Sequence, residues 1–212
     1  MSPVRRCRRM LTATLALVLA VVAAQTAQAG VLVNTTTSCD DPSFAQPFIP
    51  WLDYANYVLA PDGGLENGGG DWTFTGGAAV GAGNEPWSVL SAGDSSLINL
   101  PAGSSATSRA MCVGIENPTL RVFAHRTSGP LTSALRVDVL FEDATGAVRS
   151  LTIGGMGGVG ASLWQLSPQM VIAANLLPLL PGNHTPVAFR FTALGGGTWQ
   201  VDDLYVDPFR TG

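Results

Sequence analysis

LRVDVLFE, residues 135–142, places apolar side chains on one face of an extended chain and mostly polar ones on the other. This period of two is typical of a β-strand that is buried on one side only. Other strand candidates lie at residues 72–75, 78–80, 88–90, 96–100, 120–126, 187–192 and 198–206. Because Gly- and Pro-rich turns separate them, the sequence predicts an all-β chain folded as a two-sheet antiparallel β-sandwich, or jelly roll.

The composition agrees with a folded β-domain. Hydrophobic residues make up 46% of the chain, which is enough for a core, so disorder is not expected. The chain holds 25 Gly, but they follow no Gly-x-y period, which argues against a collagen-like structure. The longest apolar stretch after residue 29 is 170–180, and Asn175 and Pro178 interrupt it, so no membrane span is expected there.

The N-terminal segment has the three parts of a secretory signal peptide. Residues 5–9 contain four Arg, residues 11–24 are mostly apolar, and Ala27-Gln28-Ala29 is a small-x-small cleavage motif. The apolar part is shorter than the ~20 residues that span a bilayer. We therefore expect residues 1–29 to be a signal peptide and the protein to be secreted into the extracellular space.

The remaining chain divides into two parts. Residues 30–59 carry three prolines and several aromatic residues without a clear period, which predicts an extended N-terminal arm. Trp51, Tyr54 and Tyr57 are expected to fasten this arm to the rest of the protein. Residues 60–212 hold the strand candidates and are expected to form one jelly-roll β-sandwich domain.

The charge balance argues against several partners. The chain has no Lys, and four of its 11 Arg precede the cleavage motif, which leaves seven Arg against 15 acidic residues. A nucleic-acid partner would need basic patches, and an anionic membrane surface would need basic clusters. Neither partner is expected of this chain.

Two cysteines remain after cleavage, because Cys7 leaves with the signal peptide. Secreted proteins meet an oxidising environment, so Cys39 and Cys112 are expected to form one disulfide bond. The alternative is two separate buried thiols. A disulfide here would close a long loop of the unfolded chain, which the entropic model values at about 4 kcal/mol of stability.

Two segments resemble a known family. Residues 60–68 read APDGGLENG and are followed by Trp72, 76–77 (Gly-Gly) and 95–97 (Ser-Ser-Leu). This order resembles the N-terminal signature of CenC-type carbohydrate-binding modules, with Leu in place of that signature's Phe. Residues 199–206, WQVDDLYV, are similar to the closing strand of the same galactose-binding-like jelly-roll superfamily. The secreted part as a whole also resembles small secreted actinobacterial proteins of unassigned function.

The resemblance implies a structural calcium ion where the chain ends meet. Its ligands would be Glu66 and Asp202, with Asp203 as the alternative to Asp202, together with backbone carbonyls. Calcium prefers about six to eight oxygen ligands, which carboxylates beside a Gly-rich turn can supply. Strand alternation predicts that Asp202 lies on the core face with Leu204 and Val206, where an acid needs a cation or hydrogen-bond donors. The other possibility is that Asp202 accepts backbone N–H groups and no metal binds.

Signs of an enzyme are weak. The sequence has two candidate catalytic bases, His125 and His184, but no G-x-S-x-G motif that would supply a nucleophile for them. The two histidines also form no metal-binding cluster in the sequence. Residues 154–160 are expected to form a Gly-rich loop, and residues 154–158 within it lack the Lys and the following helix of a nucleotide site. Neighbouring acids along a strand point to opposite faces, whereas a glycosidase needs two facing carboxylates. We therefore predict that the protein is not an enzyme.

Aromatic residues in loops indicate a binding function instead. Trp87 lies in a Gly- and Pro-rich loop with Asn84 and Glu85, and Trp164 follows the Gly-rich segment. An indole suits the apolar face of a sugar ring, while amide and carboxylate groups bond its hydroxyls. We therefore predict a secreted, non-catalytic module that binds extracellular or cell-wall carbohydrate through these four residues. The alternative is a structural or adhesive surface protein that binds other proteins.

Overall fold

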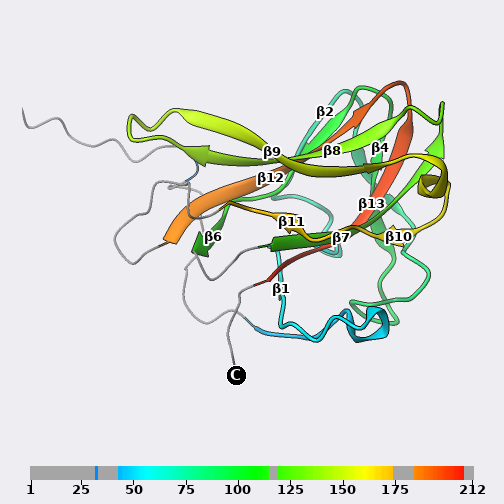
Figure 1. Ribbon diagram of the computed structural model, residues 1–212, viewed down its shortest axis with the longest axis horizontal. Coiled ribbons are helices and arrows are strands. Elements are labelled where there is room, and N and C mark those ends of the chain that lie inside the picture. The colour runs from blue at the N-terminus through cyan, green and yellow to red at the C-terminus, as the bar shows by residue number, and fades with distance from the viewer. Residues whose placement is uncertain (1–31, 33–42, 115–118, 174–183, 208–212) are drawn as a thin grey trace, which may run out of the picture.

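The computed structural model describes residues 32, 43–114, 119–173 and 184–207, and two antiparallel sheets pack face to face in it (Figure 1). The first, here called the β13 sheet, has the strand order β10 (Gln165–Leu166), β7 (Thr119–Ser128), β13 (Thr198–Asp207), β4 (Ser96–Leu100) and β3 (Ala79–Ala82). In the same sheet β1 (Val58–Leu59) pairs with β13, and β11 (Met170–Val171) pairs with β7.

The second, here called the β12 sheet, has the order β2 (Thr73–Thr75), β5 (Ser105–Thr107), β12 (His184–Leu194), β8 (Ala134–Glu142) and β9 (Val148–Gly157), and β6 (Met111–Gly114) pairs with β12. Two short 3-10 helices are described, η1 (Ile49–Trp51) and η2 (Val159–Ser162). No helix in the described ranges is long and apolar enough to cross a membrane. The prediction of an all-β chain with two antiparallel sheets is confirmed.

The core lies between the two sheets, where apolar side chains from alternate strand positions meet. Val122 of β7, Val201 of β13, Val137 of β8 and Phe189 of β12 belong to one buried cluster, and Trp199 is fully buried in it. The alternation that predicts the strands therefore also marks the residues that hold the sheets together, because burial of apolar surface is the dominant favourable term in folding.

Residues 154–157 belong to β9, although their glycines predict a loop. The ladder between β9 and β8 explains the composition, because a Cβ on Gly155 would lie 2.4 Å from the carbonyl oxygen of Leu135. Only glycine allows the two strands to approach so closely at this point. Residues 88–90, by contrast, form no strand and belong to a loop of the candidate site.

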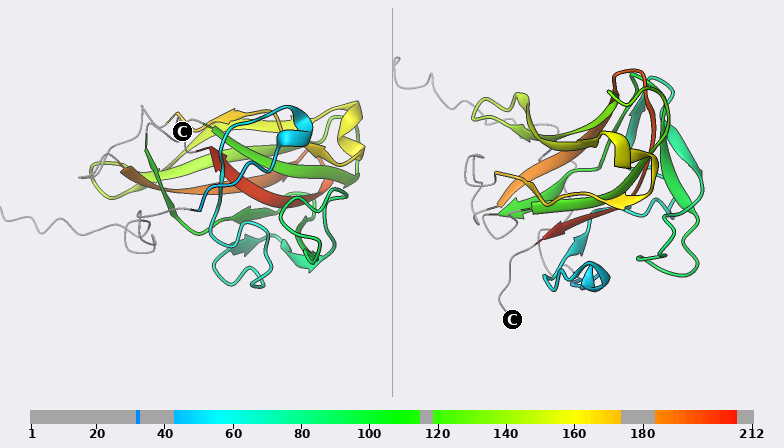
Figure 2. Two further views of the ribbon diagram at one scale, coloured as in Figure 1. Left: turned by 90° about the horizontal axis from the view of Figure 1, so that it is seen from below. Right: turned by 45° about the vertical axis from the view of Figure 1, so that its right-hand side comes forward.

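The arm, described here from residue 43, covers the part of the outer face of the β13 sheet around Phe123 and Tyr205 (Figure 2). Phe48 and Tyr57 of the arm are fully buried and join Phe123 and Tyr205 of the sheet in a second apolar cluster. Trp51 packs against the same cluster. Phe48, Trp51 and Tyr57 thus fasten the arm to the sandwich, whereas Tyr54, for which the sequence predicts the same role, is 63% exposed.

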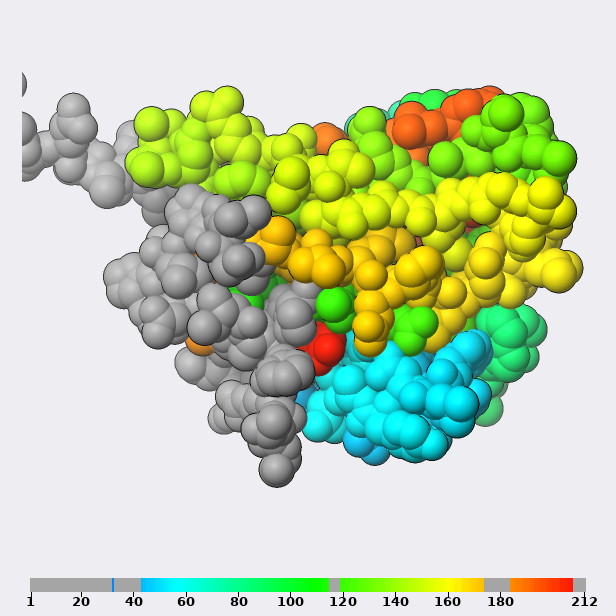
Figure 3. Space-filling model, viewed as in Figure 1, coloured from blue at the N-terminus to red at the C-terminus, as the bar shows by residue number. Residues whose placement is uncertain are grey.

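Polar contacts add to this attachment. Asp53 of the arm lies 2.7 Å from Nη1 of Arg121 on β7, and the Tyr57 hydroxyl donates to the same carboxylate at 2.7 Å. Gln169, just before β11, also reaches Asp53, at 3.4 Å. Figure 3 accordingly shows the arm, in cyan, against the segment around β11, in yellow to orange.

Cys112 lies on β6, opposite Pro186 of β12, and is partly buried. Cys39 and the predicted signal peptide lie outside the described residues. The disulfide between Cys39 and Cys112 therefore stays a prediction, as does cleavage after Ala29.

Candidate functional site

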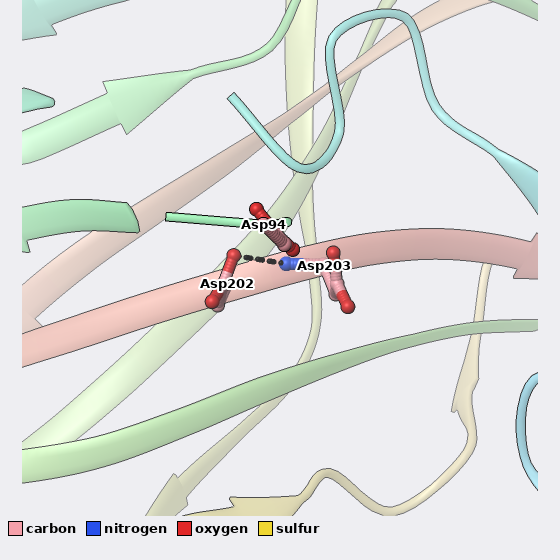
Figure 4. A group of neighbouring side chains, drawn as sticks. All are labelled: Asp94, Asp202 and Asp203. Carbon is pink, nitrogen blue, oxygen red and sulfur yellow. Dashed lines mark hydrogen bonds between the residues drawn. The ribbon is translucent and has the colours of Figure 1, made fainter. Parts of the chain in front are cut away.

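Three buried aspartates meet beside the β13 sheet. Asp202 and Asp203 come from β13, and Asp94 comes from the loop before β4 (Figure 4). One carboxylate oxygen of each lies within 4.8 Å of those of the other two. The three residues are only 7%, 1% and 0% exposed for Asp94, Asp202 and Asp203. Such a group of acids, removed from water, needs protons, donors or a cation.

A β-bulge in β13 positions this group. Asp202 pairs with Phe123 of β7, but the next pair in the register is Tyr205 with Arg121, so β13 has one residue more than β7 between them. Asp203 accommodates the extra residue, and its φ of 51° lies in the left-handed region. That conformation costs of order 1 kcal/mol for a residue with a Cβ.

The bulge overturns the expected orientation of Asp202. Alternation predicts Asp202 on the core face with Leu204 and Val206, but the register places it on the outer face with Phe123. Leu204 and Val206 do belong to the core, because the extra residue shifts the alternation between them and Asp202. The carboxylate of Asp202 therefore lies outside the main core, under the loops that cover the sheet.

A Gly-rich turn covers the carboxylates. A Cβ on Gly64 would lie 3.1 Å from Oδ1 of Asp203 and 2.3 Å from Cδ2 of Leu90, so a side chain has no room there. The backbone N–H of Leu204 donates to the carbonyl of Gly63 at 3.1 Å, which holds the turn against β13. The two segments that resemble CenC-type modules thus meet at the acidic group.

Hydrogen bonds satisfy one of the three aspartates. Oδ2 of Asp202 accepts the backbone N–H of Glu85 at 3.0 Å, and Oδ1 accepts the N–H of Asp203 at 2.9 Å. With the carboxylates ionised, no hydrogen bond of ordinary length and angle from the described residues reaches either oxygen of Asp94, either oxygen of Asp203 or Oδ1 of Asn84. Weaker approaches of backbone N–H groups from Ser95, Ser96 and Leu90 offset only part of the effect of burial on Asp94 and Asp203. Five buried oxygen atoms of three neighbouring residues therefore lack a partner at ordinary hydrogen-bond geometry.

Burial raises the pKa of all three aspartates. It raises the pKa of Asp202 to about 8, with a contribution from the charge of Asp203. It raises the pKa of Asp203 to about 7, with contributions from the charges of Asp94 and Glu85. The pKa of Asp94 rises to about 7 through burial and the neighbouring Glu66. At neutral pH the site therefore favours a bound proton or a cation.

Glu66 lies at the edge of this group. It is exposed, and its Oε1 accepts the backbone N–H of Ser95 at 2.9 Å. Its pKa is lowered to about 2 because it can share a proton with Asp94 and because Ser95 donates to it. The structure thus brings Asp202 and Asp203 together with Asp94, and Glu66 interacts with the group through Asp94.

Sequence reasoning missed Asp94. The residue lies in an ordinary Ser- and Gly-rich turn, and such acids are common on protein surfaces. The one signal is its place directly before residues 95–97, which form part of the family-like pattern. Its burial depends on β4 pairing with β13, which no local pattern indicates.

The donor set fits a hard divalent cation. Calcium holds oxygen ligands at about 2.3–2.6 Å, so any two of them lie no more than about 5 Å apart. The 4.8 Å grouping of the three aspartate oxygens satisfies this limit. The oxygens without partners, on Asp94, Asp203 and Asn84, are of the carboxylate and amide kinds that calcium binds. Zinc would favour His or Cys ligands, and this group has neither.

The same group has the facing carboxylates that a glycosidase requires, but it is too deeply buried to reach a sugar. Asp94, Asp202 and Asp203 face one another, yet none of them is more than 7% exposed. A glycosidase needs its two carboxyl groups on either side of an accessible sugar bond. These carboxylates therefore do not form a glycosidase site in this conformation.

The loop of Trp87 is fixed from inside by Glu85. Glu85 is 1% exposed, and its two carboxylate oxygens accept the backbone N–H groups of Trp87 and Val89. Trp87 itself is 45% exposed, with its ring centre 5.1 Å from that of Trp51 and 5.4 Å from that of Phe123. The predicted contact between Glu85 and a sugar is therefore corrected, because this carboxylate shapes the loop and is buried.

The other two predicted ligand residues lie on different sides of this loop. Asn84 donates from Nδ2 to the backbone carbonyl of Asp94 at 3.1 Å, so its amide belongs to the acidic group. Trp164 is partly buried on the outer face of the β13 sheet, with its ring centre 4.3 Å from that of His125. The structure thus places Trp87 and Trp164 on one outer face, over neighbouring outward residues of β7, and turns Asn84 away from it.

Comparisons with known proteins are limited to structure, because no family model and no curated protein sequence matches the chain. A xylan-binding domain of carbohydrate-binding module family 22 has 19% identity and a TM-score of 0.46, over 72% of this chain and 100% of that one. TmCBM61, solved with β-1,4-galactotriose, has 17% identity and a TM-score of 0.39, over 70% and 96% of the two chains. The arabinose-bound MgGH51 α-L-arabinofuranosidase has 13% identity and a TM-score of 0.48, over 70% and 26%. Likeness at this level says nothing about the ligand of this chain.

Proposed function

We propose that the chain is a secreted, non-catalytic module that binds carbohydrate on the outer face of the β13 sheet. Trp87 carries the proposal, because its indole is 45% exposed while buried Glu85 fixes the backbone around it. A rigid indole offers a platform for the apolar face of a sugar ring and loses little conformational entropy on binding. Trp164 adds a second ring on the same face.

The sequence supports the same ligand class. Residues 60–68 and 199–206 resemble the two ends of CenC-type carbohydrate-binding modules, and the predicted signal peptide supports an extracellular partner. The excess of acidic over basic residues argues against polyanionic partners. These features favour a polysaccharide outside the cell.

Affinity electrophoresis through gels that contain a neutral polysaccharide tests this function. Trp87→Ala should abolish the retardation of the wild-type protein, while the loss of two ring contacts lowers its stability by about 1–3 kcal/mol. Val148→Ala is the matched control, because Val148 is 47% exposed on β9 of the other sheet. Equal retardation of Trp87→Ala and wild type would remove Trp87 from the proposal, and an unfolded Trp87→Ala protein would make it a structural residue.

We further propose that the acidic group holds a structural calcium ion, with Asp94, Asp202, Asp203 and Asn84 as its side-chain ligands and Glu66 beside them. The five buried oxygens without partners support this assignment. The ion would supply positive charge where buried carboxylates otherwise need protons. Because Asn84 and Asp94 lie before and after Trp87 in the one loop between β3 and β4, the bound ion would also hold the platform in place.

A protein-binding role is the second candidate. Leu52, Val159 and Leu163 are 77%, 77% and 72% exposed, which is unusual for large apolar side chains. Exposed apolar groups are a feature of surfaces that bind other proteins. A glycan array separates the two candidates, because selective binding to particular glycans supports the carbohydrate module and uniform absence of binding supports the alternative.

A further inference from the structure

Four side chains form a row across the outer face of the β13 sheet. Gln200 of β13 lies opposite His125 of β7 on one side and opposite Asn99 of β4 on the other. Trp164, directly before β10, extends the row beyond His125. All four side chains are partly exposed. The row is therefore accessible and runs perpendicular to the strands.

A chain of hydrogen bonds fixes the polar part of the row. Nε2 of His125 lies 2.7 Å from Oε1 of Gln200, and Nε2 of Gln200 donates to Oδ1 of Asn99 at 2.8 Å. Because Oε1 can only accept, Nε2 of His125 is the donor, and Nδ1 of the neutral ring becomes an acceptor. The amide of Asn99 lies over Gly81, where a Cβ would come within 1.9 Å of Nδ2. The hydrogen-bonding groups of these three side chains that the chain of bonds does not use are thus held in fixed directions.

Aromatic rings border this polar row. The ring of Trp164 closes it beyond His125, at 4.3 Å between ring centres. Trp87 lies over Phe123, which is two residues from His125 on the same face of β7. The row crosses three strand-to-strand steps of about 4.8 Å each, or roughly 14 Å in all. That length suits a short run of sugar rings better than a single ring.

The arginines of β7 nearest the row are already engaged with other groups. Asp202 is the next outward residue of β13 after Gln200, and it leads to the buried acidic group. Arg126, next to His125 in the chain, is buried and donates to the carbonyl of Pro130 at 3.1 Å. Arg121 is ion-paired with Asp53. Within the described part of the chain, neither of these β7 cations is available to balance a negative ligand at the row.

We infer that this row binds a neutral oligosaccharide segment laid across the strands and excludes carboxylated or sulfated glycans. The inference rests on the proposed function and assigns the ligand class and the residues that orient it. The fixed amides and imidazole would bond sugar hydroxyls, and Trp164 and Trp87 would contact apolar ring faces. An anionic glycan would lose the water around its charge without gaining an ion pair, because both arginines of β7 near the row already have partners.

Affinity electrophoresis with two polysaccharides, neutral β-1,4-galactan and β-1,4-xylan, and with anionic polygalacturonate tests the inference. His125→Phe keeps a ring against Trp164 but removes the donor, and Gln200→Leu breaks both hydrogen bonds of the chain. Each variant should weaken binding to a retained neutral glycan roughly fivefold to tenfold, the loss typical of one or two hydrogen bonds. Thr73→Ala is the control, because Thr73 is exposed on β2 of the other sheet and should bind as wild type does.

The outcomes separate this inference from the proposed function. Full binding by His125→Phe and Gln200→Leu, with loss of binding in Trp87→Ala, would overturn the assignment of the row as the ligand site. It would leave the proposed carbohydrate-binding function standing. Tighter retention by polygalacturonate than by the neutral glycans would overturn the neutral ligand class. Absence of retention of wild type by every polysaccharide would overturn both. Should Gln200→Leu fail to fold, Asn99→Ser tests the same chain of bonds from its other end.

Discussion

Asp94 and Asp203 place carboxylate oxygens within 4.8 Å of each other, although neither side chain receives a hydrogen bond of ordinary length and angle from the described residues. Two ionised carboxylates repel strongly at this separation when they are shielded from water. The folded state therefore favours a proton or a cation between them. The stability of the protein should therefore depend on the pH and on the concentration of a divalent cation.

Removal of calcium should destabilise the protein. An ion that binds the folded state raises its stability by mass action, and each kcal/mol shifts the Tm by about 2–4 °C for a domain of this size. A chelator should therefore lower the Tm, and added calcium should restore it. Asp203→Asn should abolish the response, whereas Asp71→Asn, an exposed acid paired with Arg109, should keep it. An unchanged Tm of the wild type in chelator would remove the metal from the proposal.

In chelator, stability should fall as the pH rises. The unfolded pKa of these aspartates is near 3.8, and the folded values are about 7 for Asp94 and Asp203 and about 8 for Asp202. A group with a raised folded pKa binds its proton more tightly when folded, so its contribution is complete below the unfolded value and is lost as the pH rises through the folded value. Thermal unfolding between about pH 4 and pH 8 measures this loss, and a Tm that rises across the window would contradict it.

Added calcium should offset the loss of stability at high pH. Protons and the ion compete for the same carboxylates, so the gain in Tm from added calcium should be larger near pH 8 than near pH 5. Asp203→Asn should show little gain at either pH. Equal gains at both pH values in the wild type would place the bound ion elsewhere on the protein.

Glu85→Gln should weaken carbohydrate binding and stability together. Gln keeps the size of Glu85 but replaces one of the two acceptor oxygens that hold the N–H groups of Trp87 and Val89. A hydrogen bond to a buried charge contributes about 1.5–3 kcal/mol, so the loop should loosen. Amide hydrogen exchange at Trp87 and Val89 should become faster, and retardation by polysaccharide should decrease.

Asp143→Asn provides the comparison for that variant. Asp143 also organises a turn, because its Oδ1 accepts the N–H groups of Thr145 and Ala147 at 2.9 and 3.1 Å. This turn joins β8 to β9 in the other sheet, so its loosening should leave carbohydrate binding unchanged. Equal loss of binding in both variants would mean that the effect of Glu85→Gln is not specific to the Trp87 loop.

Cys39→Ser should lower the Tm without changing the strand content seen by circular dichroism. The predicted bond to Cys112 on β6 would link the arm to the β12 sheet, and loss of such a disulfide typically removes about 2–4 kcal/mol of stability. Thiol titration of the unfolded wild-type protein without reductant should find no free thiol. Two free thiols would contradict the pairing.

Most of the strands that local alternation predicts are present in the structure, although residues 88–90 form none. Residues 96–100 coincide with β4, and residues 135–142 cover all but the first residue of β8, because one face of each strand is apolar. β10 and β11 have only two residues each and exist because β7 lies alongside them. No period can be read from two residues, so these strands depend on tertiary contacts that the sequence does not display.

The candidate site was predictable only in part. Asp202 and Asp203 could be found from the closing segment, but the face that Asp202 occupies depends on a bulge against β7, which alternation cannot reveal. Asp94 reaches the group through long-range strand pairing. Glu85 was misassigned although its bonds are local, since it accepts from residues two and four positions later. An acid that starts such a turn is better interpreted first as a backbone acceptor.

Residue 203 is the extra residue of the bulge, and it has no partner in the ladder between β13 and β7. Its deletion would pair Leu204 with Val122 and leave the pairs on either side of them unchanged. The strand would keep every core residue in place but would lose one of the three clustered carboxylates. The strand pairing and the acidic group thus depend on different residues of the same short segment. A single deletion in a descendant chain could remove the acidic group and keep the strand pairing. Across a lineage of such proteins, the presence of this extra residue would record selection for the acidic group itself, independent of selection for the fold.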